Sequence, residues 1–177
     1  MFHRKPILAK ALGHSNPFHG LRLLADAITR VAAAEKGRTP IPVAHARILH
    51  VLDLIVEVSN GTLVQYFWNS SGDNANALED DLACIGCHEL LLAIAAARME
   101  VFGGPSPSDI LARRLAMKAF FHTHPFNDDD DTHRLSQLAP SPMCARATAL
   151  IRATDTALPR KTLEWAHLNS TAFTRLR

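Results

Sequence analysis

Apolar residues recur at helical spacing along most of the chain. Between residues 21 and 31 they follow a three-four-three spacing, which places them on one face of an α-helix. We expect this helix to begin at Gly20 and to end at Gly37, because the prolines at 40 and 42 cannot continue it. Residues 43–59 are apolar nearly all round, which favours a central helix, although their β-branched side chains leave a strand possible.

Turn and break residues divide the rest of the chain into six further predicted helices. The fourth of them is expected to begin with Ser106 as N-cap, because Pro107 follows at the first helical position and Asp109 at the third. We expect these helices at 63–68, 74–85, 88–102, 106–121, 143–157 and 160–177. The chain is therefore predicted to be all-α, a single-domain bundle of about six to eight helices.

The two ends of the chain are expected to differ from its middle. Residues 1–19 contain Pro6, Gly13 and Pro17 among basic and histidine side chains, and we expect a flexible basic arm there. Residues 20–177 are predicted to form the helical domain. Its core is expected at 43–104, and its C-terminal part at 141–177 follows a break at two closely spaced prolines.

Residues 60–86 carry the most specific local pattern in the protein. An aromatic run contains the single tyrosine of the chain and would supply much of a core cluster, packed on the helix predicted at 43–59. The residues after it bond readily to nearby backbone, and the glycine among them adopts positive φ at no steric cost. We therefore expect a structural motif, an aromatic anchor followed by a tight turn, formed by Tyr66, Phe67, Trp68, Asn69, Ser70, Ser71 and Gly72.

The sequence of this stretch resembles that of the DNA-mimic protein nineteen family. Asn60-Gly61, then residues 65–73 and a helix closed by Gly86, match the family pattern over about residues 57–104. Thr62 stands where a second glycine is usual, and Cys87 stands where a small residue such as alanine is usual. The resemblance implies a small all-helical bacterial protein that forms a homodimer. Named members of the family present carboxylates that imitate DNA phosphates and so occupy a DNA-binding protein.

Charge is segregated along the chain. Residues 1–50 have a net charge of +6, residues 51–97 contain no Lys or Arg and have −7, and residues 98–177 have +3. The acidic block coincides with the motif, and its carboxylates are the candidate partner-binding residues: Asp73, Glu79, Asp80, Asp81 and Glu89. The three consecutive acids at 79–81 fan across about 200° of helix surface. The total of +2 argues against strong mimicry, and the acids could instead solvate and cap helices.

Cys84-Ile85-Gly86-Cys87-His88 matches the attachment pattern of c-type haem. Covalent haem needs export, and the basic start of the chain does not read as an export signal. The pattern also falls at a glycine-broken helix junction that the resemblance explains without haem. We therefore favour two small apolar residues packed at a turn, and expect no cofactor.

A second group of residues has the composition of a metal site. His122, His124 and His133 lie near Asp128 and the three aspartates that follow it, and imidazole with carboxylate suits Zn²⁺ or another divalent ion. A run of four aspartates is more often solvated surface, so no metal is expected. A metal-dependent enzyme using His122, His124 and aspartates 128–131 stays as an alternative.

The function predicted from these observations is binding to another protein. Ser70, Ser71 and Asp73 show no nucleophile elbow, so we expect no catalytic residue. Three cysteines suit a reducing cytoplasm. The chain contains no run of eighteen apolar residues, so we expect no membrane span. The partner is expected to be a DNA-binding regulator, with no direct contact to nucleic acid. An immunity-like protein that neutralises a toxin would use the same acidic face.

Overall fold

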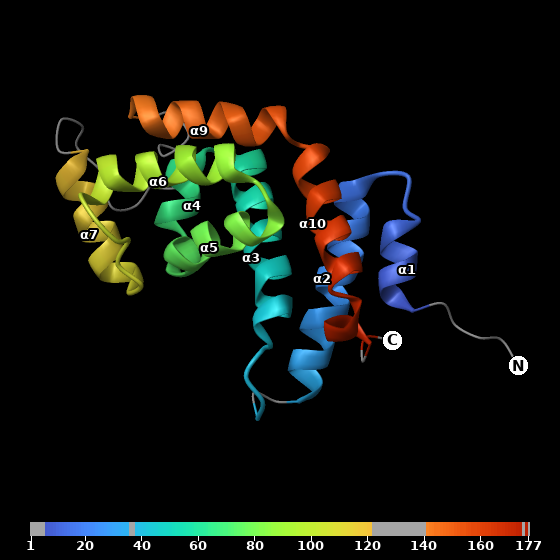
Figure 1. The fold of residues 1–177 in the computed structure, drawn as a ribbon. Helices are drawn as coiled ribbons and strands as arrows, with labels where there is room; N and C mark the ends of the chain where they lie inside the picture. The colour runs from blue at the N-terminus through green and yellow to red at the C-terminus, as the bar shows by residue number, and fades with distance from the viewer. Residues whose placement is uncertain (1–5, 36–37, 122–140, 175, 177) are drawn as a thin grey trace, which may run out of the picture. The chain divides into compact units, whose positions relative to one another are not determined.

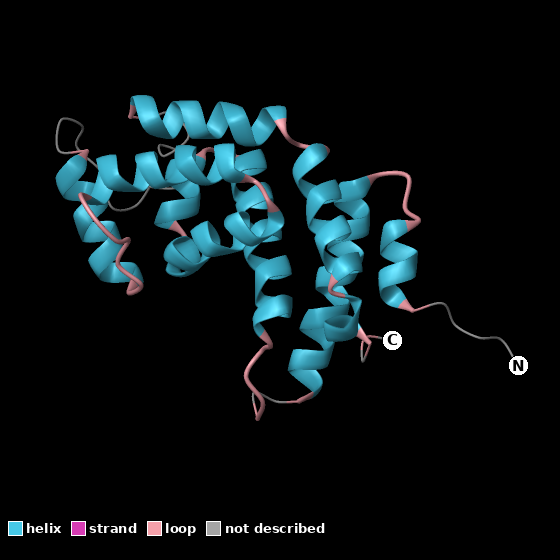
Figure 2. Ribbon diagram, in the orientation of Figure 1, coloured by secondary structure: helices cyan, strands magenta, loops and turns pink. Residues whose placement is uncertain are grey.

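The computed structural model describes residues 6–35, 38–121, 141–174 and 176. These residues form nine α-helices, two 3₁₀-helices and no strand (Figures 1 and 2). The all-α prediction is confirmed, although the described residues alone form more helices than the six to eight expected. They group into two compact units: Met1–Leu52 with Thr154–Arg177, called the terminal unit here, and Asp53–Ala153, called the central unit.

The terminal unit brings together segments from both ends of the chain. In it α1, α2 and α10 pack against one another, and Figure 1 shows α2 and α10 side by side. Gly20 allows the close approach, because a Cβ there would lie 2.4 Å from the carbonyl oxygen of Ala11 and 3.1 Å from Cδ1 of Leu163. The elements are α1 (Ile7–Leu12), α2 (Pro17–Ala34), the first half of α3 (Val43–Asn60), α10 (Ala157–Leu168) and η2 (Ser170–Phe173).

The expected arm at 1–19 is corrected over the residues that the structure describes. Residues 7–12 form α1, and Ile7, Leu8 and Ala11 are buried. The next helix begins at Pro17 rather than at Gly20, because the side-chain oxygen of Asn16 accepts the N–H of Phe18 at 2.9 Å and acts as N-cap. An N-cap with proline at the first helical position is a strong start signal that the sequence reading overlooked. Residues 1–5 lie outside the described part.

The central unit is built around α6. This helix packs on α5, α7 and α9, and Figure 1 shows α6 and α9 lying alongside each other. The start of α4 is fixed on α9, since the N–H of Leu63 donates to the hydroxyl oxygen of Thr148 at 3.0 Å. The elements are the second half of α3, α4 (Leu63–Trp68), η1 (Ser70–Asn74), α5 (Ala75–Ile85), α6 (His88–Phe102), α7 (Ile110–Phe120) and α9 (Pro142–Ala153).

The ends of α5 and α7 show where local sequence was sufficient and where it was not. Gly86 ends α5 in the left-handed conformation at φ 77°, as predicted, and the N–H of Cys87 returns to the carbonyl of Leu82 at 2.8 Å. By contrast α7 begins at Ile110 and not near Ser106. Its N-cap is Asp109, whose carboxylate accepts the N–H of Ala112 at 2.8 Å.

The C-terminal helices differ from those predicted at 143–157 and 160–177. The first ends at Ala153, the second runs from Ala157 to Leu168, and the short η2 follows it. Leu163 and Phe173 are buried, whereas Leu168 is 83% exposed. Apolar periodicity predicted that these two C-terminal helices form, but it did not predict where they begin and end.

Candidate partner-binding surface

The aromatic motif forms part of the core of the central unit. Tyr66 and Phe67 are fully buried and Trp68 is nearly so. The ring of Phe67 meets the ring of Phe102 on α6 edge-to-face, with centroids 5.4 Å apart. The rings of Tyr66 and Phe67 lie 5.8 Å apart. The motif therefore joins α4 to α6 through apolar contact.

The polar residues of the motif converge on one carboxylate, that of Glu57 in α3. Its Oε2 accepts the side-chain amides of Gln65 at 3.0 Å and Asn69 at 2.8 Å. Its Oε1 accepts the hydroxyl of Ser71 at 3.0 Å. One carboxylate thus accepts three side-chain hydrogen bonds from the motif and its flanking residue. These motif residues hold the corner together and are engaged with the protein itself.

The other side of the motif surrounds the guanidinium of Arg113 from α7. This side chain is fully buried. Its Nε donates to the carbonyl of Phe67 at 2.6 Å, and its Nη2 donates to the carbonyl of Asn69 at 2.8 Å and to the carboxylate of Asp73 at 2.6 Å. Its Nη1 donates to the carbonyl of Pro107 at 2.8 Å. One arginine thus ties three segments of the chain into a single corner.

Gly72 is required by this arrangement. A Cβ at that position would lie 2.7 Å from the carbonyl oxygen of Phe67 and 2.8 Å from Nε of Arg113. Neither atom is the free end of a flexible side chain, so no larger residue fits without displacing the buried arginine. Packing explains which residues occur in the motif. Ser70 is the one exposed residue among its seven members.

The five candidate carboxylates lie in three different environments. Asp73 is 44% exposed and paired with Arg113, and Glu79 is 19% exposed and paired with both Nε and Nη2 of Arg98. Asp81 is only 4% exposed. Asp80 on α5 and Glu89 in the first turn of α6 are exposed, and neither forms an ion pair among the described residues.

The consecutive acids at 79–81 follow the expected helical fan. One of them is half-buried, the next is exposed and the third is buried. Asp80 therefore shares the outward face of α5 with Ala77 and Cys84, which are also exposed. Of the five candidate carboxylates, only Asp80 and Glu89 are exposed and outside any ion pair among the described residues.

Sequence reasoning missed the partners of these carboxylates. Arg113 lies 40 residues after Asp73, and Arg98 lies 19 residues after Glu79. No local sequence pattern indicates either pair. Glu57 was detectable in part, because it is an acid within a helix that is apolar nearly all round. A charge in that position usually has a buried partner.

The two units carry opposite net charges. The central unit, Asp53–Ala153, contains thirteen Asp and Glu against seven Lys and Arg, a net charge of −6. The terminal unit contains four acids against twelve bases, a net charge of +8. The total of +2 is therefore a sum over an acidic part and a basic part, and it says little about either surface.

The remaining candidates are located as follows. His122, His124, His133 and aspartates 128–131 lie outside the described residues. Within the described ranges, no group of three or more His, Cys, Asp or Glu has a metal-binding arrangement. No helix in the described part of the chain is long and apolar enough to cross a membrane.

The three cysteines differ in accessibility. Cys84 at the end of α5 is exposed, and Cys87 is half-buried. Cys144 on α9 is buried, and burial raises the pKa of its thiol to about 11. The thiol of Cys144 is therefore protonated and unreactive at neutral pH.

Comparison with known proteins relates the central unit to a family. The family model described as DMP19-like protein matches residues 39–154, about two thirds of the chain. The matched region is longer than residues 57–104, over which the sequence motif predicted the match. It includes the whole central unit and the start of α3. The searches of curated proteins and of solved structures each gave no match. Because the family model matches more than half of its length, the chain belongs to the family of DMP19-like proteins.

Proposed function

We propose that the protein is a non-catalytic protein-binding module of the DNA-mimic type. Its central unit would occupy the nucleic-acid-binding surface of a basic partner protein. The observation that carries the proposal is the charge of the region that matches the family. Residues 39–154 contain thirteen acids against eight bases, a net charge of −5, although the whole chain is basic.

The basic residues that offset this charge lie mostly in the terminal unit, outside the family match. Fields of exposed charges are screened beyond about 8 Å at physiological salt. A partner therefore responds mainly to the charges within that distance of the surface that it contacts, and not to the net charge of the chain. A total charge of +2 is therefore compatible with the proposal.

The working residues of the proposed surface are Asp80 and Glu89. Both are exposed, and neither is neutralised by an ion pair among the described residues. Asp73 contributes less, because Arg113 already balances its charge. Glu79 and Asp81 support the fold, since the first is paired with Arg98 and the second is buried.

A nuclease-treated pull-down from the source cell tests the proposal. The bait is the full chain beside an Asp80→Asn, Glu89→Gln double variant. An Asp26→Asn, Glu164→Gln variant is the matched control, because it removes two exposed acids from the terminal unit. We expect a basic DNA-binding protein to be retained by wild type and control, and to be lost by the double variant.

The captured protein is then purified and bound to labelled duplex DNA. Wild-type protein is expected to displace that DNA, and the double variant to do so about tenfold less well, because two exposed charges are lost. Displacement should weaken with rising salt. If the double variant displaces DNA as well as wild type, Asp80 and Glu89 are not the working surface. A captured toxin that does not bind DNA would identify an immunity protein instead.

A further inference from the structure

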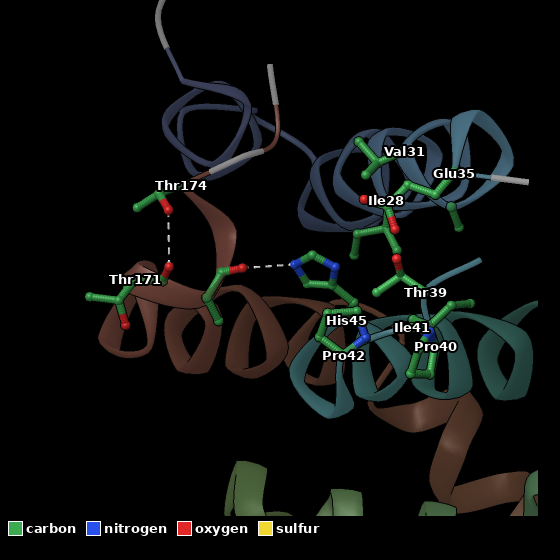
Figure 3. Close-up of a pocket in the computed structure, with 12 residues that line it drawn as sticks. Ile28, Val31, Glu35, Thr39, Pro40, Ile41, Pro42, His45, Thr171 and Thr174 are labelled. Carbon is green, nitrogen blue, oxygen red and sulfur yellow. Dashed lines mark hydrogen bonds between the residues drawn. The ribbon is translucent and has the colours of Figure 1, made fainter. Parts of the chain in front are cut away.

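A cavity of about 240 Å³ lies within the terminal unit, far in sequence from the proposed acidic surface. It is bounded by the C-terminal half of α2, the segment that leads into α3, and η2 (Figure 3). Ile28, Val31, Pro40 and Pro42 give it a largely apolar wall. An apolar wall with a few convergent polar groups is typical of small-molecule sites.

His45 supplies the most informative polar group of this cavity. It is 7% exposed, and its ring lies in Figure 3 between η2 on one side and Ile28 and Thr39 on the other. Nε2 is 2.8 Å from the carbonyl oxygen of Ala172. Because a carbonyl oxygen only accepts, Nε2 donates this hydrogen bond, and Nδ1 is left as the ring nitrogen that can accept one.

The acceptor of His45 is open toward the cavity. Within the described residues, the ring forms its hydrogen bond to Ala172 and an aromatic contact with Phe173, and no second hydrogen bond. An N–H or O–H group placed there would form a hydrogen bond that no described residue supplies. The cavity therefore fits a ligand with an N–H or O–H group.

The charge of the ligand follows from Glu35. This residue caps the C-terminus of α2 and lines the cavity, and none of the described lining residues is Lys or Arg. A carboxylate that lines the same cavity as a histidine acceptor disfavours an anion and favours a cationic donor. The helix C-terminus adds partial negative charge in the same direction.

We propose that this cavity binds an alkylammonium group. The ammonium N–H donates to Nδ1 of His45, the carboxylate of Glu35 balances its charge, and the alkyl chain packs on Ile28 and Val31. The site is independent of the acidic surface on the central unit, so each proposal stands or fails alone. The same group is carried by a free small amine or by a lysine side chain of another protein.

The test is a titration of the full chain with n-butylammonium chloride, followed by NMR. We expect saturable shifts of the Ile28 and Val31 methyl signals, and an upfield shift of the Nδ1 nitrogen of His45 as it accepts a hydrogen bond. Sodium butyrate, of the same size and opposite charge, is expected to leave these signals unchanged. A shift of Nδ1 reports the proposed bond directly and would not arise from a purely structural role.

Two variants of α2 separate the site from general charge effects. Glu35→Gln is expected to weaken butylammonium binding about fivefold, the range of an exposed ion pair. Asp26→Asn removes an exposed acid from the same helix at a position that does not line the cavity, and should bind as wild type. Both residues are exposed, so neither variant should disturb folding.

Three results would overturn the proposal: no saturable shift, equal binding of butyrate, or equal weakening in the two variants. Nα-acetyl-lysine amide serves as a second probe that distinguishes the source of the group. Binding of this probe together with butylammonium points to a lysine side chain. Binding of butylammonium alone points to a free amine.

Discussion

Arg113 shows how much of the central unit depends on a single side chain. Its five N–H groups meet five acceptors: the carbonyls of Phe67, Asn69, Pro107 and Ser108, and the carboxylate of Asp73. A guanidinium is tolerated in a core only when its donors are satisfied in this way. The buried charge therefore fixes the relative placement of α4, η1 and the segment before α7.

Replacement of this arginine should be costly. Arg113→Ala is expected to lower the free energy of unfolding by about 3 to 5 kcal/mol, because it leaves a cavity and several buried carbonyls without donors. Urea denaturation measures the loss. Arg114→Ala is the matched control on the next residue. Its guanidinium lies 5.0 Å from the ring centroid of Trp68 and is half-buried, so we expect a loss of about 1 kcal/mol. Equal losses in the two variants would contradict the role given to Arg113.

Tyr66 presents the opposite case, a buried polar group that the fold does not satisfy. Its side chain is fully buried, and its hydroxyl has no hydrogen-bond partner among the residues that the structure describes. Tyr66→Phe is therefore expected to raise the free energy of unfolding by up to about 1 kcal/mol, measured by the same urea titration. A loss of stability would reveal a partner of the hydroxyl.

The ionisation of Tyr66 provides an independent pH test. Burial, followed by the charge of Asp53, raises the pKa of Tyr66 well above its ordinary value. Above pH of about 10 the unfolded chain loses the phenolic proton while the folded protein retains it, so wild-type stability should fall as pH rises. This fall should be smaller in Tyr66→Phe. Because the chain has one tyrosine, absorbance at 295 nm should show no tyrosinate at pH 11 while the protein is folded.

At the scale of elements, the turn between α4 and α5 is shaped by what it must enclose. Gly72→Ala places a methyl group against Nε of Arg113 and two backbone carbonyls, with contacts of 2.7 to 2.8 Å. We expect a loss of about 1 to 3 kcal/mol in thermal or urea unfolding, typical of an overpacked core.

Two other glycines calibrate that measurement. Gly86→Ala meets no atom within 4 Å but must adopt φ 77°, so its cost should be about 1 to 2 kcal/mol of backbone strain. Gly104 has neither a close neighbour nor positive φ, and Gly104→Ala should be nearly neutral. A neutral Gly72→Ala would show that the corner yields more easily than its contacts indicate.

At the scale of the whole molecule, the prediction still to be measured is the homodimer implied by the family resemblance. We expect light scattering coupled to size exclusion to give a mass near twice the 19.4 kDa of the chain, stable over a tenfold dilution. High salt should leave the mass unchanged if the interface is apolar. A constant mass of one chain would contradict the prediction.

Much of the fold was predictable because its signals are local. The apolar stripe between residues 21 and 31, the stop at Gly86 and the aromatic run at 66–68 each act within one or two turns of a helix. The candidate surface was predicted only in composition. Asp80 and Glu89 are exposed, but Asp73 and Glu79 are engaged by arginines, and Asp81 is turned inward.

The sequence by itself determined the all-α class, the place of the fold-defining corner and the family to which the chain belongs, because each follows from residues close together along the chain. Only the tertiary structure decided which carboxylates remain free and how the charge divides between two units. It also created the cavity at His45. Two of its lining residues, His45 and Ala172, are 127 positions apart in the sequence and are joined by a hydrogen bond. The physical reason is the same in each case: burial and ion pairing depend on neighbours in space, which helical periodicity does not specify.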